Sequence, residues 1–302
     1  MGTPDPADDD SAARAREFAL WRRAAIAARQ YTVSFMGDNP ADPRGSDFGH
    51  VGSGVVVQVG TDIFAFTAAH VVDAIREEQE SGRTLHFCVG RQMVPLDEAH
   101  AYCTGVGTPR TLENDPSDAA VVRFHARQVV DAELPAHALP LSRVSPDPNR
   151  ENLNPWQVYG LPAAKLFIGE DSTREGDTFI QAFHVAGNLE PATPPHDPRI
   201  HLRFSVDDMR TEHGTPCPPW RPGGMSGCGM WGLCADRARI EEWRPEQMRL
   251  GGICHRAIPR GGGQPSVYEA LIGTRPMEHL RLIHQRIPEC RPALRAAFPD
   301  IT

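Results

Sequence analysis

Several features that would each place the chain in a particular class of protein are scarce in it. Lys165 is the only lysine among 302 residues, and acidic residues outnumber basic ones by 39 to 31, for a net charge of −8. No apolar run approaches the roughly 20 residues that span a bilayer, and no Cys-x-x-Cys pair of the kind that holds zinc is present. We therefore expect no nucleic-acid partner, no membrane partner, no metal and no cofactor.

The cysteines and the N-terminus indicate the compartment. Seven scattered cysteines leave at least one without a disulfide partner, which favours a reducing environment. The first ten residues are acidic and contain prolines, unlike the basic and then apolar start of a secretory signal. The near-exclusive use of arginine as the basic residue is typical of GC-rich bacterial coding sequences. A cytoplasmic bacterial protein is therefore predicted, although the mature form of a secreted protein would also lack a signal.

The most informative feature that is present is a serine enclosed by glycines, in the segment Gly223-Gly224-Met225-Ser226-Gly227-Cys228-Gly229. Glycine is needed where the backbone takes a positive φ or where a substrate approaches closely. The N–H groups of Gly224 and Ser226 would both face one developing oxyanion in such a turn. Alone, the segment fits any tight turn, so a nucleophile is indicated only if a base and an orienting acid exist elsewhere.

Candidates for both lie upstream. His70 ends the apolar run 63–69, which predicts a strand, and the residues after it predict a helix. Asp118 opens a second apolar run, 119–124, and Asp115 in the preceding turn is an alternative for the acid. The order His, Asp, Ser differs from the order of α/β-hydrolases, whose nucleophile precedes the histidine.

Five motifs in this order resemble those of the trypsin-like serine peptidases of the chymotrypsin fold. The spacings agree as well, with 48 residues from His70 to Asp118 and 108 from Asp118 to Ser226. The likeness covers roughly residues 31 to 275. The motifs are Gly52-Ser53-Gly54-Val55-Val56-Val57, Thr67-Ala68-Ala69-His70, Asp118-Ala119-Ala120-Val121-Val122, Val158-Tyr159-Gly160-Leu161-Pro162 and Gly224-Met225-Ser226-Gly227.

The resemblance implies a fold and a set of roles. The fold is all-β, with two six-stranded antiparallel barrels and helices at both ends of the chain. Ser226 is the nucleophile, His70 the general base and then acid, and Asp118 the carboxylate that fixes the imidazole tautomer. The N–H groups of Gly224 and Ser226 form the oxyanion hole. Met225 stands where zymogen-activated members carry an aspartate, so activation by that ion pair is not expected.

Composition along the chain, taken with this resemblance, predicts five segments: a disordered tail (1–14), an amphipathic helix followed by the first barrel (15–135), a proline-rich connection (136–155), the second barrel (156–275) and a helical segment (276–302). We expect the last segment to dock on the second barrel, and the loops 188–199 and 235–248 to flank the cleft. Strands are expected near 31–36, 51–59, 62–67, 84–89, 118–124, 178–186, 200–206, 229–233 and 249–255, and another from residue 157.

Specificity is the least determined property. Trp220, before the nucleophile, is expected to line the primary pocket, and a strand along which substrate pairs is expected at Gly252, Ile253, Cys254 and His255. His255 and Arg256 would favour an acidic substrate side chain, whereas a small or apolar side chain is the alternative. Because strand side chains alternate between faces, only one of the two is expected to face the pocket.

Three functional classes stay open at this point. The first is a regulated endopeptidase that cuts a protein partner and answers to an activating or regulatory protein. The second is a latent or inactive peptide-binding module on the same fold, which the complete set of His70, Asp118 and Ser226 disfavours. The third, an esterase-like hydrolase of small molecules, is disfavoured by the order of the motifs.

Overall fold

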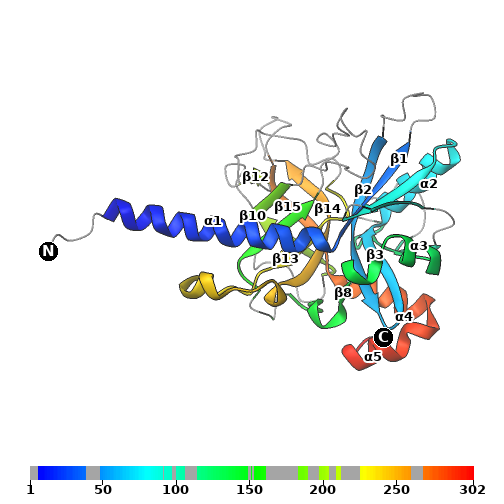
Figure 1. Ribbon diagram of the computed structural model, residues 1–302. Coiled ribbons are helices and arrows are strands. Elements are labelled where there is room, and N and C mark those ends of the chain that lie inside the picture. Colours follow the sequence, from blue (N-terminus) through cyan, green and yellow to red (C-terminus); the bar gives the residue numbers. More distant parts are fainter. Residues whose placement is uncertain are drawn as a thin grey trace.

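The computed structural model describes residues 6–38, 48–90, 92–96, 100–105, 114–148, 151, 153–160, 183–189, 197–203, 209–211, 225–259 and 268–302. The described chain is mostly β. Its strands form two sheets, antiparallel except where one short strand joins the first sheet in parallel, and helices lie at both ends of the chain (Figure 1).

The first sheet is built from the N-terminal half of the chain. Its strands are hydrogen-bonded in the order β5-β4-β1-β2-β3-β7-β6, and β8 pairs in parallel with β2. The strands predicted in this half are confirmed, but the sequence does not predict β5, β6 or β8. The bounds are β1 Thr32–Asp38, β2 Phe48–Val59, β3 Asp62–Ala68, β4 Leu85–Val89, β5 Gln92–Pro95, β6 His100–Cys103, β7 Ala119–Arg123 and β8 Leu139–Pro140.

The second sheet follows the order β11-β15-β14-β13-β9-β10-β12, and β10 also pairs with β11. Strand β11 therefore has partners on both sides, β15 and β10. The sequence does not predict β12 or β15, and the first part of the strand predicted at 178–186 lies outside the described residues. The bounds are β9 Trp156–Gly160, β10 Phe183–Leu189, β11 Arg199–Arg203, β12 Met209–Thr211, β13 Gly229–Gly232, β14 Arg249–Pro259 and β15 Tyr268–Thr274.

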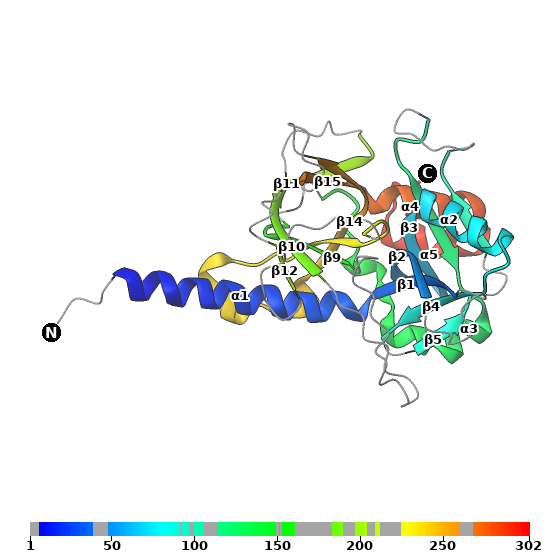
Figure 2. The same ribbon diagram turned by 90° about the horizontal axis from the view of Figure 1, so that it is seen from above.

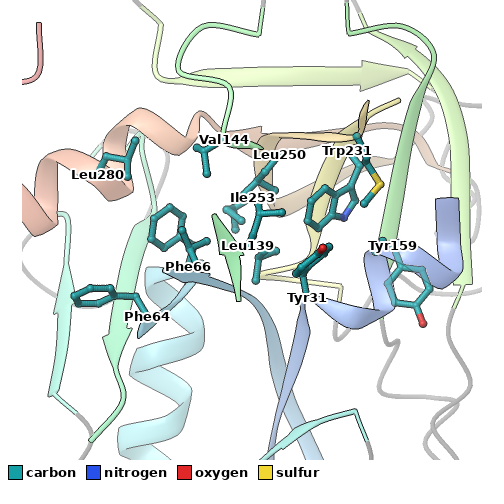
Figure 3. Close-up of a cluster of buried hydrophobic side chains, with 14 of the residues drawn as sticks. Tyr31, Phe64, Phe66, Leu139, Val144, Tyr159, Trp231, Leu250, Ile253 and Leu280 are labelled. Atoms are coloured by element: carbon teal, nitrogen blue, oxygen red, sulfur yellow. The ribbon is translucent and has the colours of Figure 1, made fainter. Parts of the chain in front are cut away.

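A single hydrophobic cluster joins the two sheets. Phe64 and Phe66 of β3 belong to the same buried cluster as Trp231 of β13 and Leu250 and Ile253 of β14 (Figure 3). Two smaller clusters lie within the individual sheets. Since protein interiors are close-packed, a shared core holds groups on one sheet at a fixed position relative to groups on the other.

The N-terminal helix α1 spans Pro6–Gln30, so residues 6–14 are helical where the sequence predicts a disordered tail. Proline in the first turn and aspartates near the positive end of the helix dipole both favour a helix start, which explains the difference. Leu20, Trp21 and Ala24 are buried, whereas Phe18 is 36% exposed. The N-terminal half of the helix extends away from the sheets (Figures 1 and 2).

The loop between β13 and β14 packs against α1. It contains the short 3-10 helices η5 Arg237–Glu242 and η6 Pro245–Gln247. Arg23 of α1 donates to the carbonyl oxygens of Ile240 and Trp243 at 2.7 and 3.2 Å, and its guanidinium lies over the Trp243 ring. This loop, expected to flank the cleft, thus anchors the N-terminal helix.

The C-terminal segment docks mainly on the first sheet, so the expectation that it would dock on the second is wrong. It comprises α4 Pro276–Arg286, the 3-10 turn η7 Pro288–Cys290 and α5 Arg291–Ala297. Helix α4 contacts β6 and β7 of the first sheet as well as β14 of the second. His279 is fully buried, donates from Nε2 to the carbonyl of Thr67 in β3 and stacks on Phe66. Leu280 and Ile283 of the helix are also buried in the cluster that contains Phe66, so apolar packing and these contacts act together in the docking.

The connection between the sheets is partly structured. It contains η1 Leu134–His137, β8 and η2 Leu141–Arg143, after the short helix α3 Ala126–Asp131. Arg143 donates to the hydroxyl of Tyr31 and to the carbonyl oxygens of Pro245 and Met248.

None of the helices in the described ranges is both long enough and apolar enough to cross a membrane.

Candidate active site

His70 is held by Asp118 at two points. The Nδ1–H of His70 donates to Asp118 Oδ2 at 2.7 Å, and the backbone N–H of His70 donates to Oδ1 at 3.0 Å. His70 lies in the first turn of α2 Ala69–Glu80, directly after β3, and the N–H of Ala69 donates to the carbonyl of Asp118. Because Nδ1 carries the proton toward the carboxylate, the lone pair of Nε2 is left to accept a proton. The imidazole is 40% exposed, so a substrate can reach it.

The turn that presents Asp118 is organised by Asp115. Asp118 has a φ of +41°, a conformation that residues other than glycine adopt only when the surroundings impose it. Asp115 Oδ1 accepts the N–H of Asp118 at 3.0 Å and the hydroxyl of Thr104 at 2.9 Å. Of the two candidate acids, Asp118 thus contacts His70, and Asp115 stabilises the turn.

The surroundings of Asp118 keep it ionised. Its side chain is only 10% exposed, and this burial by itself would raise the pKa of the carboxyl. The hydrogen bond from His70 and the charges of His70 and His255 outweigh burial, so the pKa lies below the usual value of 3.8. The carboxylate is therefore able to stabilise a protonated His70.

The serine turn is joined to the first sheet by its backbone. The N–H of Ser53 in β2 donates to the carbonyl of Ser226 at 2.9 Å, and the hydroxyl of Thr67 donates to the carbonyl of Ser53 at 2.6 Å. Gly227 has a φ of +86°, and a Cβ at this position would lie 1.7 Å from the Ser53 carbonyl oxygen. Only glycine permits this approach. The sheet that carries His70 and the turn that carries Ser226 are thus in direct contact.

The residues around Ser226 pack into the second sheet. Met225 and Cys228 are buried in one cluster, and the Sγ of Cys228 lies 4.0 Å from the Sδ of Met225. A Cβ at Gly160 of β9 would lie 1.9 Å from Cys228 Sγ, so that glycine makes room for the thiol. Met225 is therefore a core residue of the second sheet.

The described part of the chain leaves the polar groups of Ser226 available. Ser226 is partly exposed, and its hydroxyl and its N–H make no hydrogen bond to any residue of the described ranges. No direct bond to His70 is therefore present. Gly224 and Trp220, expected in the oxyanion hole and the primary pocket, lie outside the described residues.

The expected substrate strand is paired and buried. Ile253 pairs with Gly229 of β13 on one side and with Thr274 of β15 on the other, and Gly252 pairs with Met230. Cys254 is 2% exposed. His255 points away from solvent, toward Asp118, and only Arg256 of this part of the strand is exposed. His255 is thus not placed to touch a substrate side chain.

Sequence patterns do not single out several residues that position the site. Ser53 lies within one of the motifs, but its role as a backbone donor depends on a contact across 173 positions (226 − 53). Thr274 donates to the carbonyl of Ser117, next to Asp118, and His279 donates to Thr67, three residues before His70. No local pattern indicates the last two contacts, because they join the C-terminal part of the chain to the first sheet.

The described part of the chain holds neither a metal-binding cluster nor a disulfide. No group of three or more of its His, Cys, Asp or Glu side chains is arranged to hold a metal ion. Its cysteines, Cys88, Cys103, Cys228, Cys234, Cys254 and Cys290, are all thiols. Burial raises the pKa of the Cys88 thiol to about 12 and that of Cys254 further still.

Comparisons with known proteins place the chain far from characterised relatives. No family model and no curated protein matches its sequence. Among solved structures, the active form of the Rv3671c protease from M. tuberculosis is 15% identical, with a TM-score of 0.40, over 96% of this chain and 88% of that one. A structure from a study of the Sesbania mosaic virus VPg protein is 12% identical, also with a TM-score of 0.40, over 80% and 85%. Similarity at this level assigns neither family nor activity.

Proposed function

We propose that the protein is a serine endopeptidase with a chymotrypsin-like arrangement of two β-barrels. The observation that carries the proposal is the pair of hydrogen bonds that the Asp118 carboxylate accepts from His70, one from Nδ1–H and one from the backbone N–H. This arrangement fixes the ring and its tautomer, which a general base requires. The contact between Ser53 and Ser226 supports it, since it joins the serine turn to the strand pair β2–β3 that leads to His70.

The mechanism follows from these roles. Ser226 Oγ attacks the carbonyl carbon of the scissile peptide bond while its proton passes to Nε2 of His70. Asp118 stabilises the imidazolium, and the N–H groups of Gly224 and Ser226 bind the oxyanion. His70 then gives its proton to the leaving amine, which departs and leaves an acyl-enzyme on Ser226. Water, activated by His70, attacks the ester and frees Ser226.

The pairing of the second sheet supports the barrel arrangement. Strands β11, β15, β14, β13, β9 and β10 are joined in sequence, and β10 pairs back to β11. A six-stranded barrel would need such a cycle of pairings, so the contact between β10 and β11 supports the proposal. In the first sheet, β4, β1, β2, β3, β7 and β6 form the corresponding run of six, with β5 added beyond β4.

We expect a protein as substrate and a regulatory protein as partner. Met225 is buried in an apolar cluster and offers no carboxylate to a new N-terminus. We therefore do not expect activation by an ion pair between a newly cut N-terminus and a carboxylate at this position. A partner protein, a loop or the supply of substrate is left to regulate the enzyme.

Labelling by a fluorophosphonate tests the proposal, because such probes react with a serine activated by a base. The parent protein should be labelled, and Ser226→Ala should not. Ser81→Ala, which changes an exposed serine at the end of α2, is the matched control and should be labelled like the parent. Labelling of Ser226→Ala at the parental level would contradict the assignment.

The alternative is a latent or inactive peptide-binding module on the same fold. It is favoured only if the parent protein is not labelled while its fold is intact. Labelling that begins after addition of a partner protein would indicate latency, and peptide binding without labelling under any condition would indicate the binding module.

A further inference from the structure

Strand β14 contains a β-bulge beside the candidate active site, and His255 is the inserted residue. Cys254 pairs with Gly273 of β15 and Arg256 pairs with Ile272, so His255 has no opposite residue in the ladder. Bulges redirect side chains and are frequent next to active sites. Here the side chain of His255 is turned inward and is fully buried.

The buried ring lies against Asp118. His255 Nδ1 is 3.5 Å from Asp118 Oδ2, the oxygen that also accepts the hydrogen bond from His70. Both ring nitrogens of His255 lack a hydrogen-bond partner in the described part of the chain. Since buried polar groups are nearly always hydrogen-bonded, a ring in this state next to a carboxylate needs an explanation.

The charges around His255 decide its form. Burial lowers its pKa to about 4, so the ring is neutral at neutral pH. The charged or titratable groups that act on it are Asp118, His70, Arg256 and Arg199. A neutral ring protonated on Nε2 would turn the lone pair of Nδ1 toward the carboxylate, which is repulsive. The ring protonated on Nδ1 would turn a donor toward it.

We propose that His255 is a positioning residue that donates a hydrogen bond from Nδ1–H to Asp118 Oδ2 and thereby holds the carboxylate for His70. The inference rests on the proposed function, because it concerns how basic His70 is. At 3.5 Å the pair is about 0.6 Å longer than a typical bond of this kind, and bonds of this type often shorten when the reacting complex forms. His255 would limit rotation of Asp118 and draw electron density from the oxygen that His70 uses.

The proposal predicts the direction of a shift at His70. Without the donor, Asp118 Oδ2 interacts more strongly with a protonated His70, so the pKa of His70 should rise. His255→Leu fills the volume without a donor, whereas His255→Asn keeps an N–H near the position of Nδ1. We expect His255→Leu to favour the protonated form of His70 relative to the parent, and His255→Asn to restore most of the parental behaviour.

Nuclear magnetic resonance of ¹⁵N-labelled histidines tests this without reliance on activity. The parent protein should show His255 protonated on Nδ1 at neutral pH, and the titration of His70 should shift in His255→Leu as described. A His255 protonated on Nε2, or equal His70 titrations in the parent and in a folded His255→Leu, would overturn the proposal. If His255→Leu does not fold, the tautomer in the parent and the titration in His255→Asn still decide it.

The rate of fluorophosphonate labelling separates this inference from the proposed function. In the dependence of the labelling rate on pH, the fall at acidic pH should occur at a higher pH in His255→Leu than in the parent, as the titration of His70 does. No labelling of the parent would count against the endopeptidase alone, and a normal rate whose fall at acidic pH is unshifted in His255→Leu would count against His255 alone.

Discussion

The backbone N–H of Ser53 donates to the carbonyl oxygen of Ser226 across a distance of 2.9 Å, and this bond joins the two sheets at the candidate active site. Ser53 lies in β2, beside the strand that leads to His70, and Ser226 lies in the turn before β13. The close approach requires a residue without a side chain at Gly227, and the hydrophobic cluster shared by the two sheets keeps them in place (Figure 3).

Gly227→Ala should disrupt this junction. The new Cβ would lie 1.7 Å from the Ser53 carbonyl oxygen, and the φ of +86° is unfavourable for alanine. We expect a loss of about 3 kcal/mol or more in the free energy of unfolding, measured in urea, together with loss of labelling. Gly82→Ala is the control, because Gly82 has a φ of +85° with no atom within 4 Å of the added Cβ. It should cost only about 1–2 kcal/mol, and equal losses would show that the clash with Ser53 is unimportant.

Asp118→Asn should abolish most of the activity with little change in shape. The amide of asparagine would disturb the tautomer of His70, and the corresponding change in a Ser-His-Asp enzyme costs on the order of 10⁴ in turnover. Asp115→Asn keeps an oxygen for the N–H of Asp118 and the hydroxyl of Thr104, so we expect a loss of at most about tenfold. The labelling rates of the two variants show which aspartate orients His70. A larger loss in Asp115→Asn than in Asp118→Asn would reverse the roles of the two acids.

Thr274→Val should slow labelling through the position of Asp118. The hydroxyl of Thr274 donates to the carbonyl of Ser117, and its removal leaves that buried carbonyl without this donor. We expect a loss of about 1–2 kcal/mol in stability and on the order of tenfold in labelling rate. Thr32→Val removes a similar buried bond, to the carbonyl of Ala28, at a junction of helix and strand that includes no residue of the candidate site. Thr32→Val should lose as much stability as Thr274→Val but should keep the parental labelling rate. If Thr32→Val slows labelling as much as Thr274→Val does, the loss of stability alone explains the slower labelling.

Stability should fall as the pH decreases from 6.5 to 4. Burial lowers the pKa of His255 and of His279 from 6.5 to about 4 in the folded protein, so in this range the unfolded chain binds protons that the folded one does not. Their contribution is complete above pH 6.5 and is lost toward pH 4, by on the order of 3 kcal/mol for each histidine. Urea unfolding at several pH values measures this slope.

His279→Gln is the companion variant for the pH experiment. Glutamine keeps a donor near the carbonyl of Thr67 but binds no proton in this range. The dependence of stability on pH should therefore weaken by the contribution of one group. An unchanged slope in this variant would exclude His279 as a source of the acid sensitivity.

The amino-acid sequence by itself determined the local features of this protein. Continuous apolar runs predict β3 and β7, and glycines around Ser226 predict a tight turn, because these patterns express the burial of a strand and the conformational freedom of glycine. The place of Asp118 directly before an apolar run, taken with the resemblance to trypsin-like peptidases, is enough to pair the histidine with the aspartate that the structure places 2.7 Å from it.

Only the tertiary structure decided which way His255 points and where the C-terminal segment docks. The bulge in β14 depends on the register with β15, so a residue expected to face the substrate turns toward Asp118 instead. Helix α4 docks on the first sheet through its buried apolar face and through the bond from His279 to Thr67. The contacts of His255 with Asp118 and of His279 with Thr67 join residues more than 130 positions apart, and no local period encodes them.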